Sequence, residues 1–345
     1  MYLCSMTSLE KNIKRFAWIS LVFVHFVILA GSVVRMTGSG MGCPDWPKCF
    51  GYAIPPTSEE QVSWGEDRIF LSGQMIVHNK ELLVAQTDFT SSTEIDPSNW
   101  KVYEKHDYAT FNPFHTWVEF INRFIGALTG IPVLILAFLT LRYAFRKRKV
   151  AVPLLGLATL FMLGFEAWLG KLVVDGNLIP GSITIHMFGS ILIVFLLLSL
   201  IRRMDGKKLM SSDSKPKRIL IVLIIVGLLQ VFFGTQVREE VDELVHQGVL
   251  DRSSWIAQLS GMFIVHRSFS WVVIALTVGL VFFMKKAQKW TAEMNLIVGL
   301  VVFQFAVGVI FTYFNIPAFL QPAHLLGAIG MLGAMWSLNM KLKKG

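Results

Sequence analysis

Charged residues are scarce in this sequence: Asp, Glu, Lys and Arg make up 16% of its 345 residues, whereas 54% are hydrophobic. A soluble protein of this length carries roughly a quarter charged residues. The apolar residues gather in blocks close to the roughly 20 residues that cross a bilayer as one helix. Most of these blocks lack the polar face that a helix on a soluble surface needs. The scarcity of charge therefore excludes a soluble helical protein and predicts an integral membrane protein.

The hydrophobic blocks predict eight transmembrane helices, and the fold class is therefore expected to be an all-α integral membrane protein. The predicted spans are residues 16–35, 116–141, 151–174, 183–201, 218–237, 262–284, 293–314 and 319–340.

Acidic residues are fewer than basic ones, 23 against 32, which gives a formal net charge of +9. Most of the Lys and Arg residues fall in five short regions that share one side of the membrane if the chain crosses eight times. The long loop on the other side, residues 36–115, is net acidic. This distribution follows the positive-inside rule, so both termini are predicted to be cytoplasmic. The excess of basic over acidic residues therefore reflects the membrane topology of the chain and excludes a nucleic-acid-binding surface. The five regions are 11–15, 142–149, 202–218, 285–289 and 341–344.

Two targeting signals are also missing. The first apolar block follows Lys11, Lys14 and Arg15 as in a signal peptide, but it is too long and has no convincing cleavage site. We therefore expect it to be a retained helix. The N-terminus lacks the long Arg- and Ser-rich stretch of a mitochondrial transit peptide. These features favour a bacterial cytoplasmic membrane.

Cysteine is rare, with three residues in the chain. Cys43 and Cys49 lie in the outer loop within GCPDWPKCFG, where an oxidising compartment favours a small disulfide. The pair is either structural or redox-active, and the sequence leaves both roles open. Cys4 lies on the cytoplasmic side and has no expected role.

Short matches recur in the same order in the two halves of the chain and indicate an internal duplication. They predict two tandem four-helix bundles of parallel topology, in residues 1–205 and 206–345. The outer loop 36–115 belongs to the first half, is too long for a passive connector, and is expected to fold as a cap over its own bundle. The matches are Gly31–Arg35 with Gly234–Arg238, Phe120–Arg123 with Ile264–Arg267, and Gly170, Asn177 and His186 with Gly308, Asn315 and His324.

Three histidines occupy repeated positions, namely His186, His266 and His324, and Asn122 takes the fourth equivalent place. All four lie roughly three to six residues inside the outer ends of their helices. Because a helix rises 1.5 Å per residue, they are expected about 5–10 Å below the outer boundary of the membrane. In a four-helix bundle the second and fourth helices are diagonal, so their side chains face one another. His266 and His324 therefore fit the two axial ligands of a heme. A zinc site would need more cysteine or carboxylate ligands than these four positions supply.

Arginines accompany these positions near the same outer layer, at Arg35, Arg123, Arg238 and Arg267. A guanidinium can hold a heme propionate in bidentate geometry. Contact with lipid headgroups is the competing interpretation.

Glu119 lies three residues before Asn122, so both side chains are expected on about the same helix face. A carboxylate inside a membrane is costly and usually has a functional reason, although an ion pair with Arg123 would also explain it. The second half has an apolar residue in this region, which suggests that the first half performs chemistry and the second holds a permanent cofactor.

Over nearly its whole length the chain resembles the heme A synthase family of terminal-oxidase assembly. The duplicated eight-helix plan and the outer cysteine pair contribute to this resemblance. The motifs that carry it are RMTGSGMGCPDWP after the first span, Glu119 with Arg123, Ile185-His186-Met187, His266-Arg267, and Gln321-Pro322-Ala323-His324-Leu325.

The resemblance implies that a low-spin heme b is held between His266 and His324 as a cofactor. It also implies that heme O binds in the first half as substrate, where its C8 methyl is oxidised to a formyl group to give heme A. Glu119 would then be catalytic and His186 would anchor the substrate iron. The family has a histidine where this chain has Asn122. Either an open iron position serves catalysis, or this branch has kept only a heme-binding scaffold.

Expected partners are a heme O synthase, oxidase assembly proteins, an unidentified electron donor or acceptor, and the lipid bilayer. Two other functions share the binding residues: a diheme b-type electron carrier and a non-enzymatic heme-binding assembly factor. An electron carrier is expected to have two protein ligands on each heme iron. Asn122 is a poor iron ligand, so it disfavours this function. Transport would be favoured by charged residues along a path through the core, which the sequence lacks.

Overall fold

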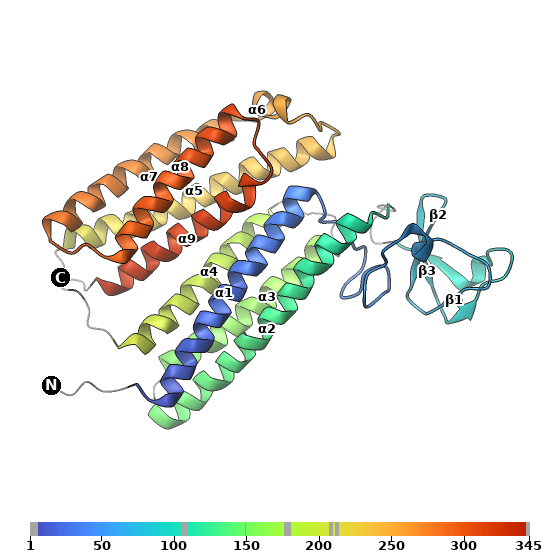
Figure 1. Cartoon of the computed structure of the whole chain (residues 1–345), viewed down its shortest axis with the longest axis horizontal. Coiled ribbons are helices and arrows are strands. Elements are labelled where there is room, and N and C mark those ends of the chain that lie inside the picture. The colour runs from blue at the N-terminus through green and yellow to red at the C-terminus, as the bar shows by residue number, and fades with distance from the viewer. Residues whose placement is uncertain are drawn as a thin grey trace. The chain divides into compact units, whose positions relative to one another are not determined.

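The computed structural model describes residues 6–104, 110–148, 150–175, 181–206, 210 and 214–342. Cys4 and Asn177, which entered the sequence predictions, lie outside these ranges. Within them, a long helix forms at each of the eight predicted positions (Figure 1). The long helices are α1 (Ser8–Thr37), α2 (Pro113–Lys147), α3 (Ala151–Asp175), α4 (Ser182–Asp205), α5 (Ser214–His246), α7 (Gly261–Lys286), α8 (Ala292–Tyr313) and α9 (Leu320–Lys341).

Seven of these helices are long and apolar enough to cross a membrane, namely α1 to α5, α7 and α8. The protein is therefore a multi-pass membrane protein. The remaining long helix, α9, has 22 residues and also carries Gln321, His324, Asn339 and Lys341. These polar side chains lower its hydropathy, although its length would suffice for a span.

Helices α5, α7, α8 and α9 form a four-helix bundle (Figure 1). The pairs in extensive contact are α5 with α7, α7 with α8, α8 with α9, and α9 with α5. These pairings close a ring in which α7 and α9 stand opposite each other. The sequence predicted this diagonal arrangement for the second half of the chain, and the ring confirms it.

The chain divides into two compact units that do not coincide with the predicted halves. One consists of residues 26–128 and 165–182, and the other of residues 1–25, 129–164 and 183–345. The first contains the outer loop and the helix segments next to it. The second contains the bundle of α5, α7, α8 and α9.

The outer loop contains two small antiparallel sheets, which an all-α description leaves out. One sheet has the order β2 (Met75–His78), β3 (Glu81–Ala85), β5 (Trp100–Val102), and the other pairs β1 (Ile69–Phe70) with β4 (Phe89–Thr90). Between β2 and β3, Asn79 and Lys80 have φ of 50° and 68°. Positive φ at both central residues is typical of a two-residue type I′ hairpin turn.

Each face of the larger sheet carries its own apolar cluster, because successive strand residues point to opposite sides. Met75 and Leu82 pack with the cysteine pair, Phe50 and Phe111. Ile76 and Ala85 pack instead with Phe70 and Trp100. The prediction that this loop folds is confirmed, and its place as a cap over the first bundle stays a prediction. Strands of two to five residues are too short for their alternation to show in the sequence.

The structure joins Cys43 and Cys49 by a disulfide, as expected for an outer loop. The two residues are 0% and 1% exposed, so the bond belongs to the apolar cluster of the cap.

Replacing both cysteines by alanine is expected to destabilise the cap by about 2 kcal/mol, because the disulfide restricts the unfolded chain over a short segment. Limited proteolysis of the purified protein measures this effect as faster cleavage within residues 50–104. Replacing the exposed Ser92 by alanine serves as the control. Equal cleavage rates for the double variant and the wild type would contradict a stabilising role.

Candidate functional site

His266 on α7 and His324 on α9 lie on opposite helices of the C-terminal bundle. Each has its main chain fixed by a glutamine of a neighbouring helix. Gln230 on α5 donates from Nε2 to the carbonyl oxygen of His266 at 2.9 Å. Gln304 on α8 donates in the same way to His324 at 2.7 Å. The two histidines are thus held by equivalent contacts.

Sequence reasoning missed these glutamines, although a signal for them was present. Gln230 stands four residues before Gly234 and Gln304 stands four residues before Gly308, so the same spacing recurs on both supporting helices. Gly234 is itself part of the site, because a Cβ there would lie 3.0 Å from Cε1 of His266. The absent side chain therefore lets the imidazole approach α5.

The two imidazoles have a donor chemistry that fits a heme. The ring of His324 stands edge-on to that of Phe311, with the ring centres 5.3 Å apart. Within the described residues, Nδ1 of both histidines is buried without a hydrogen-bond partner. Such buried nitrogens normally have a partner. Two imidazoles on opposite helices would be suitable ligands for a heme iron bound between the helices.

The arginines predicted beside these histidines differ in their surroundings. Arg238 donates from Nη1 to Oε1 of Gln321 at 2.8 Å and pairs with Asp242 at 2.6 Å. Gln321 lies three residues before His324, so Arg238 reaches the same end of α9. Arg267 is exposed, and its guanidinium carbon lies 5.8 Å from the ring centre of Phe263.

In the first half, the structure brings Glu119 together with the disulfide segment, which runs from Cys43 to Cys49. The Glu119 side chain is buried, with the residue 3% exposed. Its Oε2 accepts a hydrogen bond from the main-chain N–H of Cys43 at 2.8 Å, and its Oε1 pairs with Arg123. The carboxylate is therefore held from two sides, by the loop and by its own helix.

Arg123 also binds the loop. Its Nη1 donates to the carbonyl oxygens of Asp45 at 2.6 Å and Lys48 at 3.1 Å, and its Nη2 donates to that of Cys43 at 3.2 Å. The segment approaches α2 so closely that a Cβ at Gly42 would lie 2.4 Å from the carbonyl oxygen of His115. Glycine at position 42 permits this contact.

The other first-half residues are less closely connected to one another. Asn122 points toward α1, because a Cβ at Gly31 would lie 3.7 Å from its Oδ1. Arg35 lies half-buried in the last turn of α1. His186 lies half-buried near the start of α4, where Ser190 donates to its carbonyl oxygen at 3.0 Å.

Sequence reasoning did not single out two polar groups of the outer segment. Burial raises the pKa of Asp45 above its ordinary value, although the main-chain N–H of Gly51 donates to its Oδ2 at 2.9 Å. His115 shares a hydrogen bond of 2.8 Å between its Nδ1 and Oγ of Ser39, which in turn lies 2.6 Å from Oγ1 of Thr37. Ser39 and His115 lie 76 residues apart in the sequence, so only folding reveals their contact.

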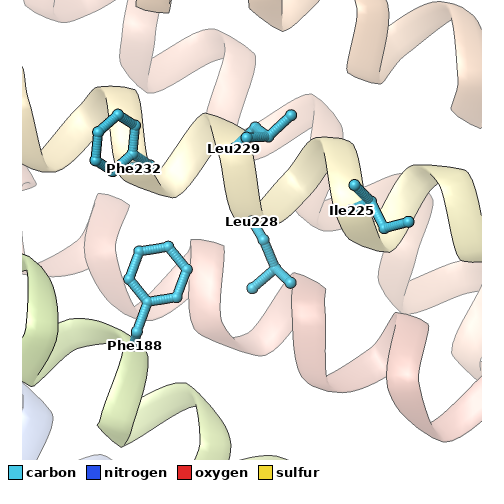
Figure 2. Close-up of a pocket in the computed structure, with 5 residues that line it drawn as sticks. All are labelled: Phe188, Ile225, Leu228, Leu229 and Phe232. Carbon is cyan, nitrogen blue, oxygen red and sulfur yellow. The ribbon is translucent and has the colours of Figure 1, made fainter.

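Figure 2 shows a pocket of about 390 Å³ between α4 and α5. All of its lining side chains are hydrocarbon, so it offers no hydrogen-bonding group or metal ligand. None of the predicted site residues lines it. The lining residues are Phe188, Ile225, Leu228, Leu229 and Phe232.

Comparisons with known proteins identify the family of this chain. Residues 14–69 and 84–336 match the model of the COX15-CtaA family, described as cytochrome oxidase assembly protein. A heme A synthase of Flavobacterium johnsoniae is 25% identical, over 94% of this chain and 95% of that protein. One of Flavobacterium psychrophilum is 25% identical, over 87% and 89%. One of Shewanella oneidensis is 26% identical, over 63% of this chain and 54% of that protein. Because the family model covers most of the sequence, the chain belongs to the COX15-CtaA family of cytochrome oxidase assembly proteins.

Proposed function

We propose that this protein is a heme A synthase, which oxidises the C8 methyl of heme O to a formyl group and so supplies heme A to terminal oxidases. The observation that carries the proposal is Glu119, a buried carboxylate held by Cys43 and Arg123 at the outer end of a membrane helix. Nearly full-length relatives bear the name heme A synthase, which supports the choice of reaction.

In this proposal Glu119 is the catalytic residue of the first half. It accepts a proton from the reacting substrate or stabilises positive charge that develops at the methyl carbon. His186 binds the substrate iron, and Arg35 contacts a propionate. Asn122 is a poor iron ligand, so oxygen or water would be able to reach the substrate iron on its side.

The second half would hold heme b, with His266 and His324 as iron ligands and Arg238 and Arg267 near the propionates. Heme b supplies electron transfer when it is bound. The chain's own contribution is to fix the two imidazoles through Gln230 and Gln304 and to leave room at Gly234. Both features support a site of fixed geometry.

The proposed topology has eight crossings, with α9 as the eighth span and both termini cytoplasmic. The functional halves are residues 1–205 and 206–345, in a bacterial cytoplasmic membrane. A heme O synthase would deliver the substrate, oxidase assembly proteins would take the product, and an electron donor or acceptor not identified by the sequence would complete the reaction.

The function is tested by expressing the chain in cells that make heme O but have no other source of heme A. Extraction and chromatography of the total heme should give a new formyl heme only when the chain is present. Unchanged heme O together with stoichiometric bound heme would instead indicate a binding protein or an electron carrier.

A further inference from the structure

We propose that Arg123 is a positioning residue, which docks the disulfide segment Cys43–Cys49 onto α2 and thereby fixes the carboxylate of Glu119. This inference rests on the proposed function. It gives Arg123 a different role from that of the propionate partner expected from the sequence.

All four N–H groups on the two terminal nitrogens of Arg123 have an acceptor within the protein. A guanidinium has two N–H groups on each terminal nitrogen. Nη1 donates to the carbonyl oxygens of Asp45 and Lys48, and Nη2 donates to that of Cys43 and to Oε1 of Glu119. Four donors thus meet four acceptors of the protein itself. A propionate could bind these nitrogens only by displacing the loop or Glu119.

Cys43 links the docked segment to the carboxylate. Its carbonyl oxygen accepts from Arg123, and its N–H donates to Oε2 of Glu119. The same residue is closed onto Cys49 by the disulfide. Movement of the segment would therefore remove the N–H from Glu119 and change the direction of its second oxygen.

The location of these contacts favours a positioning role over a purely structural one. The Arg123 side chain is 14% exposed and that of Glu119 is 5% exposed, so water competes weakly for their hydrogen bonds. Thr116 binds the residue just before the segment, since its Oγ1 donates to the carbonyl oxygen of Gly42 at 2.8 Å. Arg123 differs from Thr116 because it joins the segment directly to the carboxylate.

The decisive variant is Arg123→Lys in the full-length protein. Lysine keeps the positive charge beside Glu119, but its single nitrogen cannot bridge four separated acceptors. We expect kcat for heme A formation to fall by about tenfold or more, with KM for heme O within about twofold of the wild type, because the reacting geometry is lost and substrate binding is not. A propionate anchor would instead raise KM.

A second measurement does not depend on activity. The rate at which a water-soluble thiol reduces the Cys43–Cys49 disulfide reports how firmly the segment is docked. In Arg123→Lys this rate should rise about fivefold or more, because opening of the segment becomes more frequent. Absorbance of the heme held by the second half checks that the variant is folded.

Arg68→Lys provides a matched control in the same outer region. Arg68 also donates to main-chain oxygens, those of Glu60, Gln61 and Ser63. Its replacement should leave kcat, KM and the reduction rate unchanged. If Arg68→Lys lowered kcat as much as Arg123→Lys, a general loosening of the cap would explain both and the inference would be overturned.

The outcomes separate this inference from the function on which it rests. A raised KM with an unchanged reduction rate in Arg123→Lys overturns the positioning role. A lowered kcat with a faster reduction supports it. If the wild type formed no heme A, the proposed function would fail, and the reduction rate alone would still decide whether Arg123 docks the segment.

Discussion

Replacing Glu119 by glutamine is expected to lower heme A formation by about 100-fold or more, while heme b stays bound in the second half. The carboxylate uses both oxygens as acceptors, one for the N–H of Cys43 and one for Arg123. Glutamine has one acceptor oxygen, so its amide must face a donor on one side in either orientation. The variant therefore loses both the negative charge and the fixed orientation.

The measurement is the formyl heme extracted from cells that supply heme O, together with the visible spectrum of the purified variant. Glu293→Gln is a suitable control, because Glu293 is also a partly buried acid in a membrane helix that pairs with a cation, Lys341. That change should leave heme A formation intact. Normal heme A levels in Glu119→Gln would refute a catalytic role for the carboxylate.

Replacing His324 by leucine is expected to abolish six-coordinate, low-spin heme in the second half, where we propose that heme b binds between His266 and His324. Leucine has no nitrogen to donate to iron, and the opposite ligand, His266, cannot complete a six-coordinate site alone. The Soret absorbance of low-spin heme, measured per mole of purified protein, should be lost almost completely. Heme A formation should fall with it, because we propose that this heme supplies electron transfer.

His25→Gln is the matched control for a membrane histidine without a cofactor role. Nδ1 of His25 lies 2.8 Å from the carbonyl oxygen of Leu21 on the same helix, which accounts for the side chain by local hydrogen bonding. Its Soret band should match that of the wild type. An undiminished band in His324→Leu would show that the iron has other ligands.

The limits of sequence-based prediction are clearest at α5. Hydropathy predicted a span over 218–237, whereas the helix continues to His246. Beyond Arg238, four of the eight helix residues are acidic, so the apolar signal stops although the helix does not. In this extension Glu240 accepts from Ser260, the residue before α7, and Val241 packs against Trp255 and Ile316. Tertiary contacts maintain helical structure where composition alone gives no indication of it.

The sequence by itself determined the positions of the long helices and the opposition of His266 and His324. These properties are local or periodic, since the length of an apolar run and the spacing of repeated residues are set by the bilayer and by helix geometry. The tertiary structure decided what holds Glu119. The contacts of Arg123 and Glu119 with the disulfide segment join residues 75 to 80 positions apart in the chain. Hydrogen bonds of this kind have no sequence period, so they exist only once the loop has folded against α2.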